Sequence, residues 1–139
     1  MVGKVKLVQG MAFDAISASG HTVRIDAAPE VGGNEEGPRP LELVLLGLGG
    51  CTGMDVISIL RKMRQEVSGY EVNLHAERAE EHPKVFTRIV VEHVVTGRNL
   101  DEAAVKKAVE LSEHKYCSAS AMLSKAASVE HRYRLVSEE

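Results

Sequence analysis

Apolar and polar residues alternate with a period of two in three short segments at the start of the chain. In the third segment, Val23 and Ile25 fall on one side, and Arg24 lies between them. Such alternation places successive side chains on opposite faces of an extended strand. Glycine and serine separate the segments, so the pattern predicts three strands in an antiparallel meander. The strands are expected at positions 4–9, 12–17 and 21–26.

A loop rich in glycine and proline follows, and the period of the apolar residues then changes. The segment Leu41–Leu48 is apolar almost all round, which predicts a buried helix opened by Pro40. From Cys51 to Val67, apolar side chains recur at steps of three and four, as on one face of a helix. Three glycines are expected to weaken or bend the helix just before Cys51: Gly47, Gly49 and Gly50.

The second half of the chain mixes both periods. Asn99 and Glu102 have the spacing of a capping box, and Ser118 is expected to cap a further short helix. Strands and helices do not alternate regularly, so the predicted fold class is α+β, in a single domain of residues 1–139. The predicted elements are a β-hairpin with arms at 70–79 and 84–96, helices at 104–111 and 118–126, and a strand at 129–136.

Composition narrows the classes of function. Hydrophobic residues make up 44% of the 139 residues, enough for a core without disulfides, whereas aromatic residues make up 4%. The net charge is −3 with both signs interspersed, which argues against a nucleic-acid partner. The most apolar stretch, Leu41–Gly50, is too short to span a membrane, and no signal-peptide pattern precedes it. We therefore expect a cytoplasmic protein that binds neither nucleic acid nor membrane.

Two cysteines, Cys51 and Cys117, are the strongest candidates for chemistry. Each is predicted near the start of a helix. There, the macrodipole and free N–H groups favour a thiolate, the nucleophilic form of the side chain. In a reducing compartment, such a pair is more often a redox couple or a set of metal ligands than a permanent disulfide. A disulfide also requires the helices to bring the two Cα atoms within about 7 Å.

Two other roles for the cysteines are open from the residues alone. Free cysteine is among the most buried residue types, so both could be small core side chains. A metal site is the other role, because His114 lies three residues before Cys117 and Cys51 could add a thiolate. Neither CxxC nor HxxxH spacing supports a metal site, and the other histidines follow no ligand pattern. We expect no metal and no cofactor.

The residues around Cys51 carry the signature of a family. From Pro40 to Val56 the chain reads PLELVLLGLGGCTGMDV. Together with the 29–33 loop, the 114–118 segment and the order of the elements, this segment resembles the OsmC/Ohr family. The family comprises osmotically inducible protein C and the organic hydroperoxide resistance proteins. The resemblance is greatest to its OsmC-like branch and spans essentially the whole chain.

The resemblance implies a fold and an activity. The fold is OsmC-like, with antiparallel sheets, long central helices and an intertwined homodimer whose active sites lie at the subunit interface. The activity is reduction of organic hydroperoxides, in which Cys51 becomes a sulfenic acid and Cys117 resolves it to a Cys51–Cys117 disulfide. A dithiol reductant, such as a lipoyl protein, would then regenerate the thiols.

Two residues that accompany the cysteines in typical Ohr proteins are displaced here. A glutamate usually follows the helix-opening proline directly, but Leu41 has that place and Glu42 comes one residue later. An arginine in the N-terminal hairpin is also typical, and no arginine precedes Arg24. Glu42, Arg39 and Arg24 are therefore the candidate supporting residues.

These departures keep a second function open. Asp55 lies one turn after Cys51, and a carboxylate there would raise the pKa of a neighbouring thiol. The alternative is a small-molecule binding or redox-sensor protein on the OsmC scaffold, with weak turnover or none.

Overall fold

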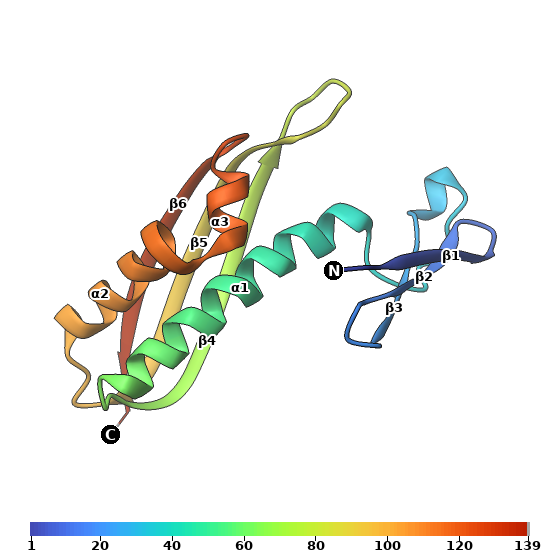
Figure 1. The fold of residues 1–139 in the computed structure, drawn as a ribbon. Helices are drawn as coiled ribbons and strands as arrows, with labels where there is room; N and C mark the ends of the chain where they lie inside the picture. The colour runs from blue at the N-terminus through green and yellow to red at the C-terminus, as the bar shows by residue number, and fades with distance from the viewer. Residues whose placement is uncertain (139) are drawn as a thin grey trace. The chain divides into compact units, whose positions relative to one another are not determined.

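The computed structural model describes residues 1–138, which form two compact units (Figure 1). The first unit covers residues 1–44 and the second begins at Leu45. Two separate three-stranded sheets together with helices confirm the α+β class. The elements in chain order are β1 (Lys4–Gln9), β2 (Ala12–Ile16), β3 (Thr22–Ile25), the 3₁₀ turn η1 (Pro29–Val31), α1 (Pro40–Lys62), β4 (Glu66–Arg78), β5 (Phe86–Arg98), α2 (Glu102–Leu111), the π-helical turn η2 (Ser112–Tyr116), α3 (Ser118–Leu123) and β6 (Ser128–Ser137).

The first unit is the antiparallel meander that the alternating pattern predicts. β1 pairs with β2, and β2 pairs with β3. Gly10 has a φ of 55° in the turn between β1 and β2, a conformation that favours glycine. After β3 the chain folds back so closely that a Cβ added at Gly33 would lie 1.7 Å from the Ala27 carbonyl oxygen. The glycines therefore set the course of this loop.

The second unit is a sheet of order β4-β5-β6 with helices on one face (Figure 1). β4 and β5 form the predicted antiparallel hairpin. β6 lies parallel to β5, because α2, η2 and α3 carry the chain back across the sheet before β6 begins. The sheet is therefore mixed, whereas the resemblance implied antiparallel sheets.

Two apolar clusters fill the space between helices and sheet. Both use the inward positions of the strands, which alternate with exposed polar residues as a half-buried sheet requires. The buried members of the first cluster are Val56, Leu60, Val95, Val105, Ala108 and Val109. Those of the second cluster, which we call the cysteine cluster, are Leu48, Ile89, Val91 and Cys117.

α1 differs from its prediction in both continuity and length. It runs without interruption from Pro40 to Lys62, so the glycines do not break it. Arg64 has a φ of 57°, which ends the helix and turns the chain into β4. Val67 therefore belongs to a strand, although its spacing continued the helical pattern.

The starts of the two later helices also differ from the predicted caps. Asp101, not Asn99, caps α2, and its carboxylate accepts the Ala103 N–H at 3.0 Å. At α3 the cap is Cys117, not Ser118. Both predictions failed by one or two residues, a common uncertainty at helix ends.

α1 is long and apolar enough to cross a membrane by length and composition alone. Its most apolar eighteen-residue window has a mean hydropathy of 1.9, and 28% of that window is buried. Within the second unit, Leu48, Val56 and Leu60 of this helix pack into the clusters on the sheet. Core helices pass the same test, so this result carries no membrane assignment.

Candidate functional site

Cys51 lies in the middle of α1, half-buried at the edge of the cysteine cluster. The expectation of a position near a helix start is therefore wrong. In mid-helix the backbone N–H groups are bonded to carbonyl oxygens of the preceding turn and are not free to stabilise a thiolate. Gly49 has another role, since an added Cβ would lie 2.7 Å from the Leu74 side chain. It allows close packing of α1 on β4 next to Cys51.

Cys117 lies between η2 and α3 and is only 2% exposed. Its sulfur accepts the Ser120 N–H at 3.3 Å, and its own N–H donates to the Ser112 carbonyl at 2.8 Å. The backbone on both sides therefore fixes this thiol. The position at the start of α3 agrees with the sequence prediction.

The structure brings the two thiols together, although 66 positions separate them along the chain (117 − 51). Both are free cysteines, and both belong to the cysteine cluster. Burial raises the pKa of the Cys117 thiol to about 11, against the opposing effect of the Ser120 N–H. The neighbouring Cys51 side chain and the Asp55 carboxylate raise that pKa further. Cys117 is therefore a neutral thiol at neutral pH.

A buried polar group joins α1 to η2 beside the cysteines. Ser112 lies at its centre: its hydroxyl donates to Asp55 at 3.0 Å and is 2.7 Å from the Thr52 hydroxyl. Ser112 and Thr52 are fully buried, and their mutual contact satisfies both. Asp55 therefore holds the turn before Cys117, in line with a structural role.

A second polar chain runs diagonally across the inner face of the sheet. The Tyr70 hydroxyl is 2.7 Å from His93 Nδ1, and His93 Nε2 is 3.1 Å from His131 Nδ1. His131 Nε2 is 3.2 Å from the Ser120 hydroxyl. The rings are stacked, with centroids 6.0 Å apart for Tyr70–His93 and 5.4 Å for His93–His131. We call these four residues the histidine chain.

Burial determines the charge of the histidine chain. It lowers the pKa of both His93 and His131 to about 4, so the two imidazoles are neutral at neutral pH. Burial likewise raises the pKa of the Tyr70 hydroxyl. The chain is therefore an uncharged series of hydrogen-bond donors and acceptors. It ends at Ser120, whose backbone N–H contacts the Cys117 sulfur.

Sequence reasoning missed this chain. It treated the histidines as scattered because it tested only for metal-ligand spacing. The alternation along the strands could have identified it. His93 falls between Val91 and Val95, and His131 between Val129 and Tyr133, on the inward sides of their strands. A polar residue in an inward position requires a buried partner.

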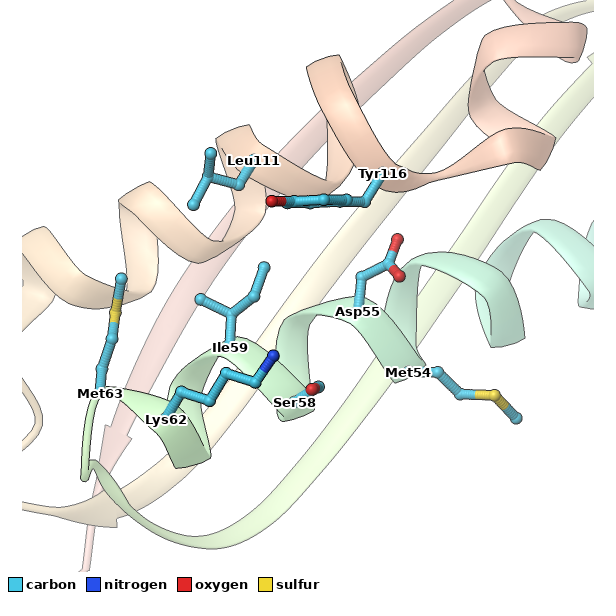
Figure 2. A pocket seen from close by; sticks show the side chains of 8 residues that line it. All are labelled: Met54, Asp55, Ser58, Ile59, Lys62, Met63, Leu111 and Tyr116. Carbon is cyan, nitrogen blue, oxygen red and sulfur yellow. The ribbon is translucent and has the colours of Figure 1, made fainter.

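A pocket of about 530 Å³ opens between α1 and the α2–η2 segment (Figure 2). Asp55 and Tyr116 face each other across it, and Lys62 lines it from α1. Its walls are largely apolar, with a carboxylate and an ammonium group as its charges. The lining residues are Met54, Asp55, Ser58, Ile59, Lys62, Met63, Leu111 and Tyr116.

Comparison with known proteins assigns the family. Residues 32–132 match the family model described as OsmC-like protein. The chain belongs to the OsmC family. Protein YhfA of Escherichia coli K12 is 46% identical over 136 residues, covering 98% of each chain. This result confirms the resemblance.

Solved structures agree on the OsmC fold. A hypothetical protein of Aquifex aeolicus is 31% identical, with a TM-score of 0.86 over 99% of this chain and 97% of that one. The organic hydroperoxide resistance protein OhrB of Bacillus subtilis is 21% identical, with a TM-score of 0.61 over 96% and 98%. The latter likeness concerns the fold alone.

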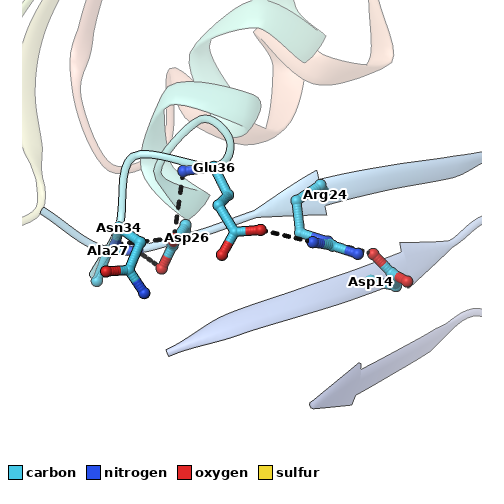
Figure 3. A network of polar contacts seen from close by, with 6 residues as sticks. All are labelled: Asp14, Arg24, Asp26, Ala27, Asn34 and Glu36. Atoms are coloured by element: carbon cyan, nitrogen blue, oxygen red, sulfur yellow. Dashed lines mark hydrogen bonds and ion pairs between the residues drawn. The ribbon is translucent and has the colours of Figure 1, made fainter. Parts of the chain in front are cut away.

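Arg24, one of the candidate supporting residues of this OsmC protein, is engaged within the first unit (Figure 3). Its guanidinium donates to Asp14 at 2.6 Å and to Glu36 at 3.0 Å. The Arg24 guanidinium lowers the pKa of Asp14, and the two contacts together connect β2 and β3 to the loop that follows. The structure therefore gives Arg24 a structural role between two carboxylates.

Arg39 and Glu42 also have partners within the first unit. Arg39 forms an ion pair with Glu35. Its backbone N–H donates to the Glu42 carboxylate at 2.7 Å, which is one half of a capping box at the start of α1. Glu42 thus caps the helix in which Cys51 lies.

The metal alternative concerns His114, Cys117 and Cys51. Residues 1–138 contain no cluster of three or more His, Cys, Asp or Glu side chains placed to hold an ion. His114 is largely exposed and contacts Glu113 at 3.5 Å.

Proposed function

We propose that this protein is a thiol-dependent peroxidase that reduces organic hydroperoxides, with Cys51 as the peroxidatic and Cys117 as the resolving residue. Membership of the OsmC/Ohr family suggests a function related to oxidative stress and hydroperoxides. The observation that carries the proposal is that two free thiols, one half-buried and the other buried, pack in the same apolar cluster. A hydroperoxide can reach the first, and the second is protected until the first is oxidised.

The proposed reaction has two steps on sulfur. The Cys51 thiolate attacks the hydroperoxide, the O–O bond breaks, and the alkoxide takes a proton and leaves as the alcohol. Cys117 then attacks the sulfur of the Cys51 sulfenic acid. Cys117 gives up its proton as it attacks, the S–S bond forms, the S–O bond breaks, and that proton converts the released hydroxide to water.

The surroundings of the thiols favour an organic substrate. Leu45, Leu48 and Val72 pack in the same cluster as both cysteines. Apolar walls lower the free energy of an alkyl group more than that of hydrogen peroxide, which has no apolar surface to bury. We therefore assign alkyl hydroperoxides to the site.

The proposed partners are a dithiol reductant, such as a lipoyl protein, and a second copy of the chain. Apolar side chains of α1 and α3 are exposed, with Leu46 at 57%, Met54 at 74% and Met122 at 67%. Exposed apolar surface of this kind marks an interaction site. A homodimer that covers these helices, as the family resemblance implies, would bury it. Proteins of the OsmC family are generally small and soluble, and we place this one in the cytoplasm.

One observation favours the alternative of a binding or redox-sensor protein. The pKa of Cys117 is raised, and Asp55 contributes a negative charge beside it, so the resolving thiol is a poor nucleophile at rest. A slow second step would leave the oxidised Cys51 as a long-lived signal. The pocket beside Asp55 would then serve a ligand and not a substrate.

Mass spectrometry after one equivalent of cumene hydroperoxide tests the proposal. Wild type, Cys51→Ser and Cys117→Ser are compared, with dimedone present to trap sulfenic acid. We expect a rapid Cys51–Cys117 disulfide in wild type, a dimedone adduct on Cys51 in Cys117→Ser, and an unmodified Cys117 in Cys51→Ser. Unmodified thiols in wild type after long exposure would exclude peroxidase activity. A Cys51 adduct that persists in wild type would support the sensor.

A further inference from the structure

The histidine chain ends at Ser120, and Ser120 contacts the resolving thiol. Its hydroxyl is 3.2 Å from His131 Nε2, and its backbone N–H donates to the Cys117 sulfur at 3.3 Å. Ser120 is 3% exposed, so water does not compete for either group. The side chain and the backbone of one residue thus join the imidazole to the sulfur.

The chain is fully satisfied, which gives it a fixed geometry. A neutral imidazole has one donor and one acceptor nitrogen, and both nitrogens of His93 and of His131 have a partner. All hydrogen bonds of the chain must therefore point the same way. Each residue donates either to its neighbour on the Ser120 side or to its neighbour on the Tyr70 side. Stacking of the three rings restricts their rotation further.

We propose that His131 is a positioning residue for Cys117: its imidazole holds Ser120 so that the Ser120 N–H points at the Cys117 sulfur. His93 and Tyr70 hold the imidazole in turn. An N–H directed at sulfur stabilises the thiolate that attacks the Cys51 sulfenic acid. The inference deepens the proposed function and rests on it, because disulfide formation is the step that this thiolate serves.

Stabilisation of the Cys117 thiolate by the Ser120 N–H competes with the influence of other charged and titratable groups around the site. Cys51 and Asp55 face Cys117 from α1 and disfavour its thiolate. His114 of η2 acts electrostatically on His131, as His131 does on His93. The Ser120 N–H opposes burial at Cys117 and favours the thiolate. Its alignment therefore matters for the reactivity of Cys117.

The test measures Cys117 alone, in a Cys51→Ser background, by its rate of reaction with methyl methanethiosulfonate from pH 8 to pH 12, on both sides of its pKa of about 11. The rate follows the thiolate fraction, so a higher pKa shifts the profile along the pH axis and, below the pKa, lowers the rate about tenfold for one pH unit. We expect His131→Ala to shift the profile upward and to slow the reaction about three- to tenfold at pH 8, with the rates converging at the highest pH. A mere change in access would lower the rate by the same factor at every pH, including above the pKa.

Matched variants separate positioning from a loss of structure. In His131→Gln the amide nitrogen lies close to the place of Nε2 and can still bond Ser120, so we expect it to restore the profile. Ser120→Ala removes the hydroxyl but keeps the backbone N–H, and should shift the profile as His131→Ala does, even where the latter folds poorly. His75→Ala is the control, since His75 is exposed on the same sheet.

An unshifted profile in both His131→Ala and Ser120→Ala, or a uniform scaling in both, would overturn the positioning role. This outcome is distinct from failure of the proposed function, which is measured on Cys51 in Cys117→Ser with cumene hydroperoxide. A shifted profile with an inert Cys51 would leave the positioning role intact and remove the peroxidase.

Discussion

The two compact units of the chain are stabilised by different means. In the first, only two of the described side chains are buried, those of Ala12 and Asp26, and charged contacts hold the loop after β3. The second contains both apolar clusters and the buried polar chains. Both cysteines lie in the second unit. The proposed chemistry would therefore take place where packing fixes side chains most strictly.

The first unit leaves apolar side chains of its edge strand uncovered. Val5 is 59% and Leu7 55% exposed on β1. A three-stranded sheet with so little core has little stability of its own. The proposed homodimer is one assembly that would cover these side chains. The comparison between the units can be tested by substitutions in each.

The largest expected effect is a cavity in the second unit. Leu60 is fully buried in the first cluster, so Leu60→Ala should lower the free energy of unfolding by about 2–5 kcal/mol. The matched change in the first unit, Leu7→Ala, should cost about 0.5 kcal/mol or less because Leu7 is exposed. Urea unfolding followed by circular dichroism measures both. Equal costs would show that β1 is buried in an assembly.

The next effect is a dependence of stability on pH that originates in the second unit. The unfolded chain protonates His93 below about pH 6.5, whereas the folded protein keeps it neutral down to a pKa of about 4. The free energy of unfolding should therefore fall as the pH falls from 6.5 to 4, by on the order of 3 kcal/mol from His93 alone.

Unfolding in urea at several pH values measures this slope. His93→Gln removes one of the two titrations and should make the slope shallower, with His131 supplying the remainder, at the cost of lower stability at pH 7. His75→Gln, at an exposed position, should leave the slope unchanged. Identical slopes in wild type and His93→Gln would contradict a buried neutral His93.

A smaller effect is expected at the buried carboxylate of the first unit (Figure 3). Asp26 accepts the N–H groups of Ala27, Asn34 and Glu36, and these bonds hold its pKa below the usual value. Stability from Asp26 should be present above pH 3.8 and lost as the pH falls through its lowered pKa. Asp26→Asn should lower Tm by several degrees at pH 7. An unchanged Tm would show that the loop needs no carboxylate.

Much of the fold could be predicted from the sequence because each strand has one apolar face. The strands and the hairpin followed from alternation alone. The end of α1 could not, since Val67 fits a helical spacing and only the positive φ of Arg64 separates it from the helix. The glycines before Cys51 were misinterpreted because Gly49 serves packing against Leu74, a contact that no local pattern contains.

The sequence identified the two candidate thiols of the site but not the residues that surround them. Residue type and context singled out Cys51 and Cys117. Their contact depends on the crossover that places η2 beside α1, and the histidine chain depends on the register of three strands. Neither can be derived from spacing along the chain. Asp55 was considered only as a neighbour of Cys51, and its partner Ser112 was not identified.

The smallest expected effect concerns Arg24, which the family resemblance suggested as a supporting residue for the thiol. Its ion pairs with Asp14 and Glu36 lie at a partly exposed surface of the first unit. Arg24→Gln should therefore lower Tm by no more than about 2 °C. Arg88→Gln is the matched control, because Arg88 likewise bridges two exposed carboxylates, Glu77 and Glu130.

The same two variants test whether the chemistry is confined to the second unit. If Arg24 only joins β2 and β3 to their loop, the rate of Cys51 oxidation by cumene hydroperoxide should be equal in Arg24→Gln, Arg88→Gln and wild type. Stopped-flow mixing in a Cys117→Ser background measures that rate without the resolving step. A rate that falls tenfold in Arg24→Gln alone, with Tm preserved, would mean that Arg24 stabilises the thiolate in the assembled protein.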